Sequence, residues 1–195
     1  KLYESNWISR GYESKKQEQS TYEDGKKWIT NYYNKYIDGK FIKAYAIEEY
    51  FELPIGKRGN VMIGYIDRIQ KNADGTFSIF DYKPDPKMRT QEEIDKDLQL
   101  TIYYWACKQA FGLDIKDLTL LFMKFNDHIT TSRSQKDIDI LMDYVDTTSE
   151  DIIIRQNQIK GLSRDKADEF FPPKINKYCV TSHIKLSKND LFFSH

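Results

Sequence analysis

Residues 64–83 read GYIDRIQKNADGTFSIFDYK, and the two halves of this stretch predict neighbouring antiparallel strands. Both halves are rich in β-branched and aromatic residues, and Ala73-Asp74-Gly75 separates them. If these three residues form a hairpin loop with Gly75 in the left-handed conformation, residue 72 pairs with residue 76. Counting back along both strands then places Asp67 directly opposite Asp81.

The side chain of Lys83 is expected to join these two carboxylates. Opposed residues of an antiparallel pair share a face, and so does the residue two positions further along a strand. Like charges placed opposite each other destabilise a sheet unless something compensates them, and hard divalent cations take oxygen ligands. Asp67, Asp81 and Lys83 therefore predict a Mg²⁺ or Mn²⁺ site that activates a water for attack on a phosphodiester, with the lysine assisting that water or the phosphate.

Further polar residues are expected near this set. Glu48 and Glu49 lie on the preceding strand, and alternation allows only one of them to face the site. Asp95, Gln99 and Tyr103 follow one another at i, i+4 spacing, so on a helix they form one polar stripe that faces the metal waters or the phosphate backbone.

The elements around the hairpin follow from apolar periodicity and from end signals. Residues 1–20 are predicted to be a loosely packed lead-in. Thr21 is predicted to cap a first helix that ends at Asp38-Gly39-Lys40, with Trp28 and its tyrosines in the core. The capping box at 90–93 is predicted to start one helix that runs to Gly112 and buries Trp105.

The strand pattern predicts an α/β fold with a mixed sheet. Three strands, at 44–53, 61–70 and 76–83, form an antiparallel meander, and a fourth is expected at 117–125. Strand, helix and strand after a meander make the sheet mixed, with helices on its faces. Residues 134–161 suit either one long helix or two helices with a break near 146–148. We expect a single domain over residues 1–195, with a helical part at 134–195.

Length, composition and net charge limit the kind of protein that this chain can be. The chain has 195 residues, 39% of them hydrophobic, and 30 Lys+Arg against 30 Asp+Glu, which suits one globular domain and excludes wholesale disorder. Because the net charge is zero, phosphate contacts must come from a local patch, for which Lys83, Lys87 and Arg89 are the candidates. No apolar run of about 18 residues and no signal peptide occur, so no membrane partner is expected.

The two cysteines set the expected compartment. Cys107 and Cys179 are too few for a disulfide framework or a four-thiolate cluster, which favours a reducing, cytoplasmic location. The first residue is Lys1, so we expect the chain to be a fragment of a longer protein.

In its motifs the sequence resembles the PD-(D/E)XK nuclease superfamily, most closely the RecB-like and CRISPR-associated exonuclease branch. That pattern is a glutamate on a strand, Gly-x-Ile-Asp-Arg-Ile, Asp-Tyr-Lys, and Gln-x-x-x-Tyr on a helix. The matching residues here, in the same order within about residues 40–110, are Glu48, Gly64 to Ile69, Asp81-Tyr82-Lys83, Gln99 and Tyr103.

The resemblance implies a restriction-endonuclease-like core and a role for each matched residue. Asp67 and Asp81 would bind the metal, Lys83 would be the catalytic lysine, and Glu48 would be a further acidic ligand. Glu48 is preferred to Glu49 because the family spacing Glu-x-x-Phe fits Phe51. Gln99 and Tyr103 would support the site or the nucleic acid, and Tyr82 is expected to pack on the opposite face.

Two features depart from that branch. It often has a Gly-x-x-x-His element on an early helix, whereas His128, His183 and His195 all follow the motif core. It often carries an iron–sulfur cluster, of which Phe171-Pro172-Pro173 and Cys179 resemble one end, with Ser182 where a second cysteine might otherwise stand. One cysteine cannot hold a cluster, so none is expected.

These observations predict a metal-dependent DNA nuclease, an exonuclease of DNA repair, recombination or phage-like DNA processing. Its expected partners are DNA and a helicase or other domain of the parent protein. The alternative is a catalytically silent module of the same fold, which binds DNA or a partner within a helicase–nuclease assembly. The departures above and the neutral net charge support this alternative, and the presence of all three central residues opposes it.

Overall fold

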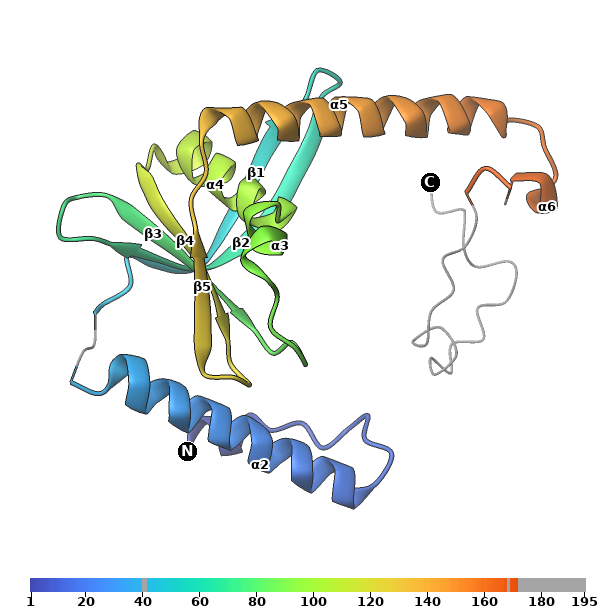
Figure 1. The fold of residues 1–195 in the computed structure, drawn as a ribbon. Coiled ribbons are helices and arrows are strands. Elements are labelled where there is room, and N and C mark those ends of the chain that lie inside the picture. The colour runs from blue at the N-terminus through green and yellow to red at the C-terminus, as the bar shows by residue number, and fades with distance from the viewer. Residues whose placement is uncertain (40–41, 168, 172–195) are drawn as a thin grey trace. The chain divides into compact units, whose positions relative to one another are not determined.

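The computed structural model describes residues 1–39, 42–167 and 169–171, and these contain one five-stranded sheet (Figure 1). Its strands, in spatial as well as chain order, are β1 (Ala46–Ile55), β2 (Asn60–Lys71), β3 (Phe77–Lys83), β4 (Ile115–Phe122) and β5 (Asp127–Thr131). Neighbouring strands are antiparallel except β3 and β4, which are parallel. The predicted mixed sheet is therefore confirmed, and β5 is an addition that the sequence analysis missed.

The hairpin between β2 and β3 has the predicted register. The N–H of Asn72 donates to the carbonyl oxygen of Thr76 at 2.8 Å, and Gly75 has a φ of 89°. The ladder pairs Arg68 with Phe80, and one further step in the same register places Asp67 opposite Asp81. The turn chemistry of a three-residue loop was enough to align the two carboxylates.

The alternation of β2 reverses just before this pair. Ile66 and Ile69 are both fully buried although they lie three residues apart, whereas a regular strand buries every second residue. On β1 the unpaired position opposite Asp67 is Glu48, which has a φ of 51°. A left-handed residue rotates the chain out of the regular pleat. The side chains of β1 therefore switch faces at Glu48, and Ala46 and Phe51 both pack in the core although they lie five residues apart.

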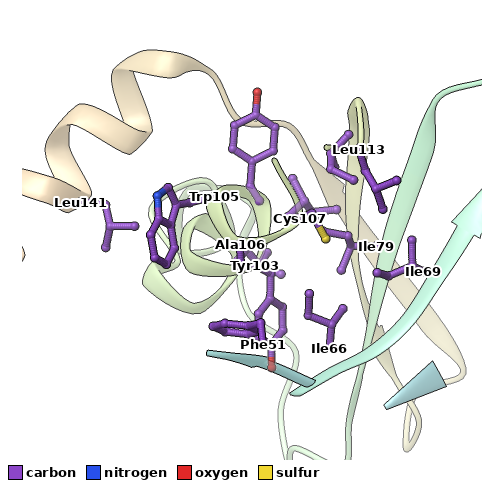
Figure 2. Packing of buried hydrophobic residues seen from close by; sticks show 14 of the residues in the cluster. Phe51, Ile66, Ile69, Ile79, Tyr103, Trp105, Ala106, Cys107, Leu113 and Leu141 are labelled. Carbon is purple, nitrogen blue, oxygen red and sulfur yellow. The ribbon is translucent and has the colours of Figure 1, made fainter. Parts of the chain in front are cut away.

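Helix α4 (Leu98–Phe111) closes the core by packing against β1 and β4. Tyr103, Trp105 and Cys107 of α4 are buried, and Figure 2 shows Tyr103 beside Phe51 and Ile66. The burial predicted for Trp105 is confirmed. Gly112, with a φ of 63°, ends the helix as predicted.

The single helix predicted from the capping box to Gly112 is wrong. Thr90 and Glu93 do form a capping box, but the helix that they start, α3 (Gln91–Asp95), is only five residues long. The Asp97 side chain then caps α4 by accepting a hydrogen bond from the N–H of Leu100 at 2.9 Å. Thr90 and Asp97, seven residues apart, each cap a helix. The sequence analysis predicted one helix here because apolar residues continue across the break between the two helices.

The first long helix starts earlier than predicted and is not part of the core. It is α2 (Lys15–Tyr32), capped by Ser14, and a π-helical turn, η1 (Tyr33–Ile37), follows it directly. Thr21 lies inside the helix, where its hydroxyl donates to the carbonyl oxygen of Gln17. Neither segment buries a residue, so the predicted core position of Trp28 and the tyrosines is wrong.

The predicted lead-in is partly ordered by aromatic contacts. It contains the short helix α1 (Leu2–Ser5). Trp7 stacks on Tyr12 with ring centroids 5.8 Å apart and meets the edge of Tyr22 on α2 at 5.1 Å. Aromatic side chains outside the core therefore pack this N-terminal segment against α2.

The chain divides into two compact units, Lys1–Asp146 and Thr147–His195. Helix α5 (Gln135–Gln158) is continuous, which decides between the one long helix and the two helices that the sequence left open. The second unit also contains α6 (Arg164–Ala167), and there the Arg155 guanidinium donates to the carbonyl oxygen of Phe170 at 2.9 Å. The predictions for Cys179, Ser182, His183 and His195 lie outside the described residues.

Among the residues that the structure describes, no helix is both long enough and apolar enough to cross a bilayer.

Candidate functional site

The centre of the site is the end of the β2–β3 hairpin, where Asp67, Asp81 and Lys83 come together. Asp81 is only 2% exposed, and its Oδ2 lies 2.7 Å from the Nζ of Lys83. The Oδ2 of Asp67 accepts a hydrogen bond from the backbone N–H of Tyr82 at 2.9 Å. The three residues that the sequence analysis singled out are thus joined through two adjacent strands.

The Asp81 carboxyl is held in an environment that disfavours its charge. Burial raises the pKa of Asp81, the charges of Asp67 and Asp97 raise it further, and the ammonium of Lys83 opposes them. Its Oδ2 is buried, and the Lys83 ammonium at 2.7 Å is a charge-assisted contact that uses one of the lone pairs of this oxygen. A buried carboxylate oxygen in this state has capacity for another cationic partner.

A chain of hydrogen bonds connects Lys83 to α4. The Nζ of Lys83 donates to the Oε1 of Gln99, and the Nε2 of Gln99 donates to the hydroxyl of Tyr103, each at 2.8 Å. Burial raises the pKa of Tyr103 to about 12, with a smaller contribution from the charges of Asp81 and Asp67. The structure therefore brings Gln99 and Tyr103 to the site, as predicted, and Tyr103 stays a neutral phenol near neutral pH.

Asp95 does not belong to the predicted polar stripe. It ends α3, and its Oδ1 accepts hydrogen bonds from Gln91 at 2.8 Å and from the hydroxyl of Thr131 at 2.7 Å. The stripe was predicted on a continuous helix, and the break before α4 removes the i, i+4 relation between residues 95 and 99.

The two glutamates of β1 differ in environment. Glu48 is exposed, whereas Glu49 is half-buried and lies close enough to Cys107 to add to the effect of burial, which raises the pKa of that thiol to about 12. Within the described part of the chain, no three His, Cys, Asp or Glu side chains are grouped closely enough to bind one metal ion. The assignment of a third carboxylate ligand to Glu48 therefore stays a prediction.

Asp97 is a further acidic residue of the site that the sequence analysis did not identify. Its charge raises the pKa of both Asp81 and Tyr103, and its Oδ2 accepts a short hydrogen bond from the guanidinium of Arg89. Arg89, predicted as a phosphate contact, is therefore paired with a carboxylate beside the site. The available signal in the sequence was the aspartate directly before the apolar segment that begins at Leu98, because aspartate is a favoured helix N-cap.

Gly64 explains why the motif begins with glycine. A Cβ atom at this position would lie 2.7 Å from Cζ and 2.8 Å from Cε1 of Phe51. Phe51 is itself buried and meets the ring of Tyr103 edge-on, with centroids 6.5 Å apart. The glycine thus lets β2 approach the aromatic pair that supports the hydrogen-bonded end of the site.

The donor set fits a hard divalent cation. Mg²⁺ is commonly held in proteins by one or two carboxylates, with waters completing its shell. Asp67 and Asp81 supply two carboxylates on opposed strands, and the Oδ2 of Asp81 is buried with the Lys83 ammonium as a single charged contact among the described residues.

Tyr82 lies on the opposite face, as predicted. Its hydroxyl is 3.1 Å from that of Tyr32 on α2, and the two rings meet edge-on with centroids 5.6 Å apart. Tyr82 therefore contributes its backbone to the site and its side chain to the packing behind it.

Comparison with known proteins agrees with this geometry. A family model described as the PD-(D/E)XK nuclease superfamily matches residues 2–183. No curated protein matches the chain.

Proposed function

Because this chain belongs to the PD-(D/E)XK nuclease superfamily, we propose that it hydrolyses phosphodiester bonds of DNA with Mg²⁺ or Mn²⁺. One observation carries the proposal: Asp67 and Asp81 are opposed on adjacent strands, and Lys83 lies 2.7 Å from Asp81. The buried oxygen of Asp81 and the hydrogen bonds to α4 support it. A pair of surface ion pairs would show neither feature.

Asp67 and Asp81 are the residues that would hold the metal. When bound, a divalent cation polarises a phosphoryl oxygen and lowers the pKa of a coordinated water. Lys83 would place its ammonium against the attacked phosphate or the attacking water, where a fixed positive charge stabilises the transition state.

Gln99 and Tyr103 would act as positioning residues. Gln99 accepts from the Nζ of Lys83, which limits the rotamers of a long side chain, and Tyr103 accepts from the Nε2 of Gln99. A catalytic group held within a fraction of an ångström works better than a mobile one. We expect Gln99→Ala to lower kcat while leaving DNA binding nearly unchanged.

Three finer parts of the proposal rest on the motif resemblance: exonucleolytic cleavage, a role in DNA repair, recombination or phage-like DNA processing, and a helicase or other domain of a parent protein as partner. The order and spacing of Glu48, Gly64 to Ile69, Asp81 to Lys83, Gln99 and Tyr103 support them. The small number of cysteines supports a cytoplasmic location, and the length and composition of the chain support one nuclease domain formed by the whole chain.

The test is degradation of end-labelled linear DNA and closed circular DNA with Mg²⁺ or Mn²⁺. Lys83→Ala should lose cleavage by at least about a hundredfold, because it removes a group that acts in the transition state. Lys116→Ala is the matched control, since Lys116 also pairs with an aspartate, Asp74, at 2.9 Å but lies outside the site.

Each result has a defined meaning. Cleavage of linear DNA only, lost in Lys83→Ala and kept in Lys116→Ala, supports a metal-dependent exonuclease with this site. Cleavage of the circle as well would make the enzyme an endonuclease. No metal-dependent cleavage, with DNA binding intact, would favour the silent module instead.

The same assay distinguishes the two glutamates of β1. If Glu48 is the third acidic ligand, Glu48→Gln loses activity and Glu49→Gln keeps it. The reverse result would assign the ligand to Glu49, whose side chain is the more buried.

A further inference from the structure

A cavity of about 380 Å³ lies where the end of α2 and η1 cover one face of the sheet. Its lining includes Tyr32, Tyr36, Arg68, Phe80 and His128. We refer to this cavity as the tyrosine pocket. Its volume is within the range of small-molecule sites in proteins, about 300–1,000 Å³.

The tyrosine pocket is separate from the nuclease site. Arg68 and Phe80, which line it, are paired across β2 and β3 and each adjoins one of the site carboxylates, Asp67 and Asp81. Successive side chains of a strand point to opposite faces. A ligand in the pocket would therefore occupy the back of the strands whose front carries the carboxylates.

Aromatic rings form much of the wall. The centroids of Tyr32 and Tyr36 are 5.4 Å apart, and those of Tyr36 and His128 are 5.9 Å apart. The hydroxyl of Tyr36 lies 3.1 Å from the Nδ1 of His128. Flat rings of this kind stack on nucleobases. Tyr36 also belongs to the π-helical turn, and isolated π turns occur frequently at functional sites.

Arg68 gives the pocket a positive charge, and the hydrogen-bond partners that the described residues supply to it are neutral. Its guanidinium donates to the carbonyl oxygen of Ile42 at 2.9 Å and to the Oε1 of Gln70 at 2.8 Å, with longer contacts of 3.5 Å to the hydroxyls of Tyr32 and Tyr82. Its Nε is buried and has no hydrogen-bond partner among the residues that the structure describes. A partly buried cation in neutral surroundings favours the binding of an anion, and guanidinium groups suit phosphate.

We propose that the tyrosine pocket binds a nucleoside monophosphate, with its base against the aromatic rings and its phosphate at Arg68. The size of the cavity, the aromatic wall and the neutral surroundings of Arg68 support this ligand class independently of one another. The proposal deepens the proposed function, because nucleoside monophosphates are what hydrolysis at DNA ends would release. Binding itself needs no cleavage, so the two can be tested separately.

The test is calorimetric titration of the full chain with deoxyadenosine monophosphate in EDTA, which keeps metal out of the nuclease site. Tyr36→Leu and His128→Ala should each weaken binding by about tenfold or more, the usual effect of losing a stacking ring. Tyr33→Ala is the matched control: it removes a tyrosine from the same π turn that is 52% exposed and does not line the pocket. Circular dichroism checks that each variant folds.

Other probes identify which part of the ligand is recognised. Deoxyadenosine and inorganic phosphate should each bind more weakly than the monophosphate. The proposal is overturned if the monophosphate does not bind, if inorganic phosphate alone binds equally well, or if the pocket variants bind like the wild type. Lys83→Ala should bind the monophosphate normally even when it cannot cleave DNA, and a loss of binding in that variant would place the ligand in the nuclease site instead.

Discussion

Asp81 shows how burial and charge compete at one residue of the site. Burial raises its pKa more than the Lys83 ammonium lowers it, so the folded protein holds this proton to a higher pH than the unfolded chain does. Between the two pKa values the native state binds more protons, and stability falls as pH rises through that interval. The charged form of Asp81 is therefore tolerated for function at some cost in stability.

We expect Asp81→Asn to raise the free energy of unfolding at pH 7 by on the order of 1 kcal/mol, because a neutral amide avoids the burial of charge. The gain should shrink as pH falls through the interval between the raised pKa of folded Asp81 and the unfolded pKa of an aspartate, because folded Asp81 takes up its proton there. Urea denaturation at pH 7 and at about pH 3.5, which is near the unfolded pKa of an aspartate, measures the free energy of unfolding of the variant and the wild type at each pH.

Asp74→Asn supplies a control of opposite sign. Hydrogen bonds from Thr76 and Lys116 lower the pKa of Asp74 to about 2, so its charge favours folding above the unfolded pKa and this contribution is lost as pH falls toward 2. At pH 7 this variant should be the less stable one. If Asp81→Asn were equally destabilised there, Lys83 would outweigh burial and the account of Asp81 would be wrong.

Gly64 sets the distance between β2 and the aromatic pair under the site. Gly64→Ala should destabilise the protein by about 1–3 kcal/mol, since its Cβ would overlap the buried ring of Phe51. Thermal or urea unfolding measures the loss. The double variant Gly64→Ala/Phe51→Leu should recover part of it, because leucine leaves the space that the ring occupied; strictly additive losses would show that the overlap is not the cause.

At the scale of elements, Arg133 holds the junction between α3 and α4. This arginine is 8% exposed, and its guanidinium donates to the carbonyl oxygens of Ile94 and Asp97 at 2.8 and 3.1 Å and to the hydroxyl of Thr101 at 2.8 Å. Both carbonyls also accept backbone N–H groups, from Asp97 and Thr101, so the guanidinium adds a second donor to each and ties the end of α3 to the start of α4. The break directs α4, and with it Gln99 and Tyr103, toward Lys83.

Arg133→Met should cost about 3 kcal/mol of stability, because the hydrogen bonds that the buried guanidinium makes to Ile94, Asp97 and Thr101 are lost together. Arg133→Lys should recover little, since an ammonium cannot reach both helix ends as a planar guanidinium does. Urea denaturation tests both. Lys96→Met, at the exposed residue between the two helices, is the control and should stay within about 0.5 kcal/mol of the wild type; a similar loss there would mean that Arg133 has no special role.

At the scale of the whole molecule, the sheet separates two surfaces with different chemistry. The α4 face carries the carboxylates and Lys83, and the α2 face carries aromatic rings and Arg68. Tyr82 belongs to both, because its N–H binds Asp67 and its hydroxyl meets Tyr32.

A divalent cation that binds only the folded chain should raise its thermal midpoint. Millimolar Mn²⁺ or Mg²⁺ is expected to raise the midpoint by on the order of 5 °C when it exceeds the dissociation constant many times over. Asp67→Asn should abolish the rise, and Asp74→Asn should keep it. A rise of the same size in all three proteins would indicate metal binding away from the site.

Local sequence was sufficient for the parts of this protein that depend on neighbouring residues. The register of Asp67 and Asp81 follows from a three-residue loop, the antiparallel direction of their strands follows from the same short connection, and the position of Lys83 follows from a spacing of two. Each of these features depends on the backbone geometry of about twenty consecutive residues. The turn residues and the alternation of side chains in the sequence indicate that geometry.

Tertiary structure alone decided the features whose partners lie far along the chain. The junction between α3 and α4 is held by Arg133, 39 residues beyond Ile94, and the exposure of α2 depends on which other elements cover the sheet. The reversal at Glu48 and Ile66 depends on the pairing of two strands. The periodicity of apolar residues cannot predict these features. It indicates which face of an element is apolar, but not which distant residue pairs with its strand or hydrogen-bonds its buried polar groups.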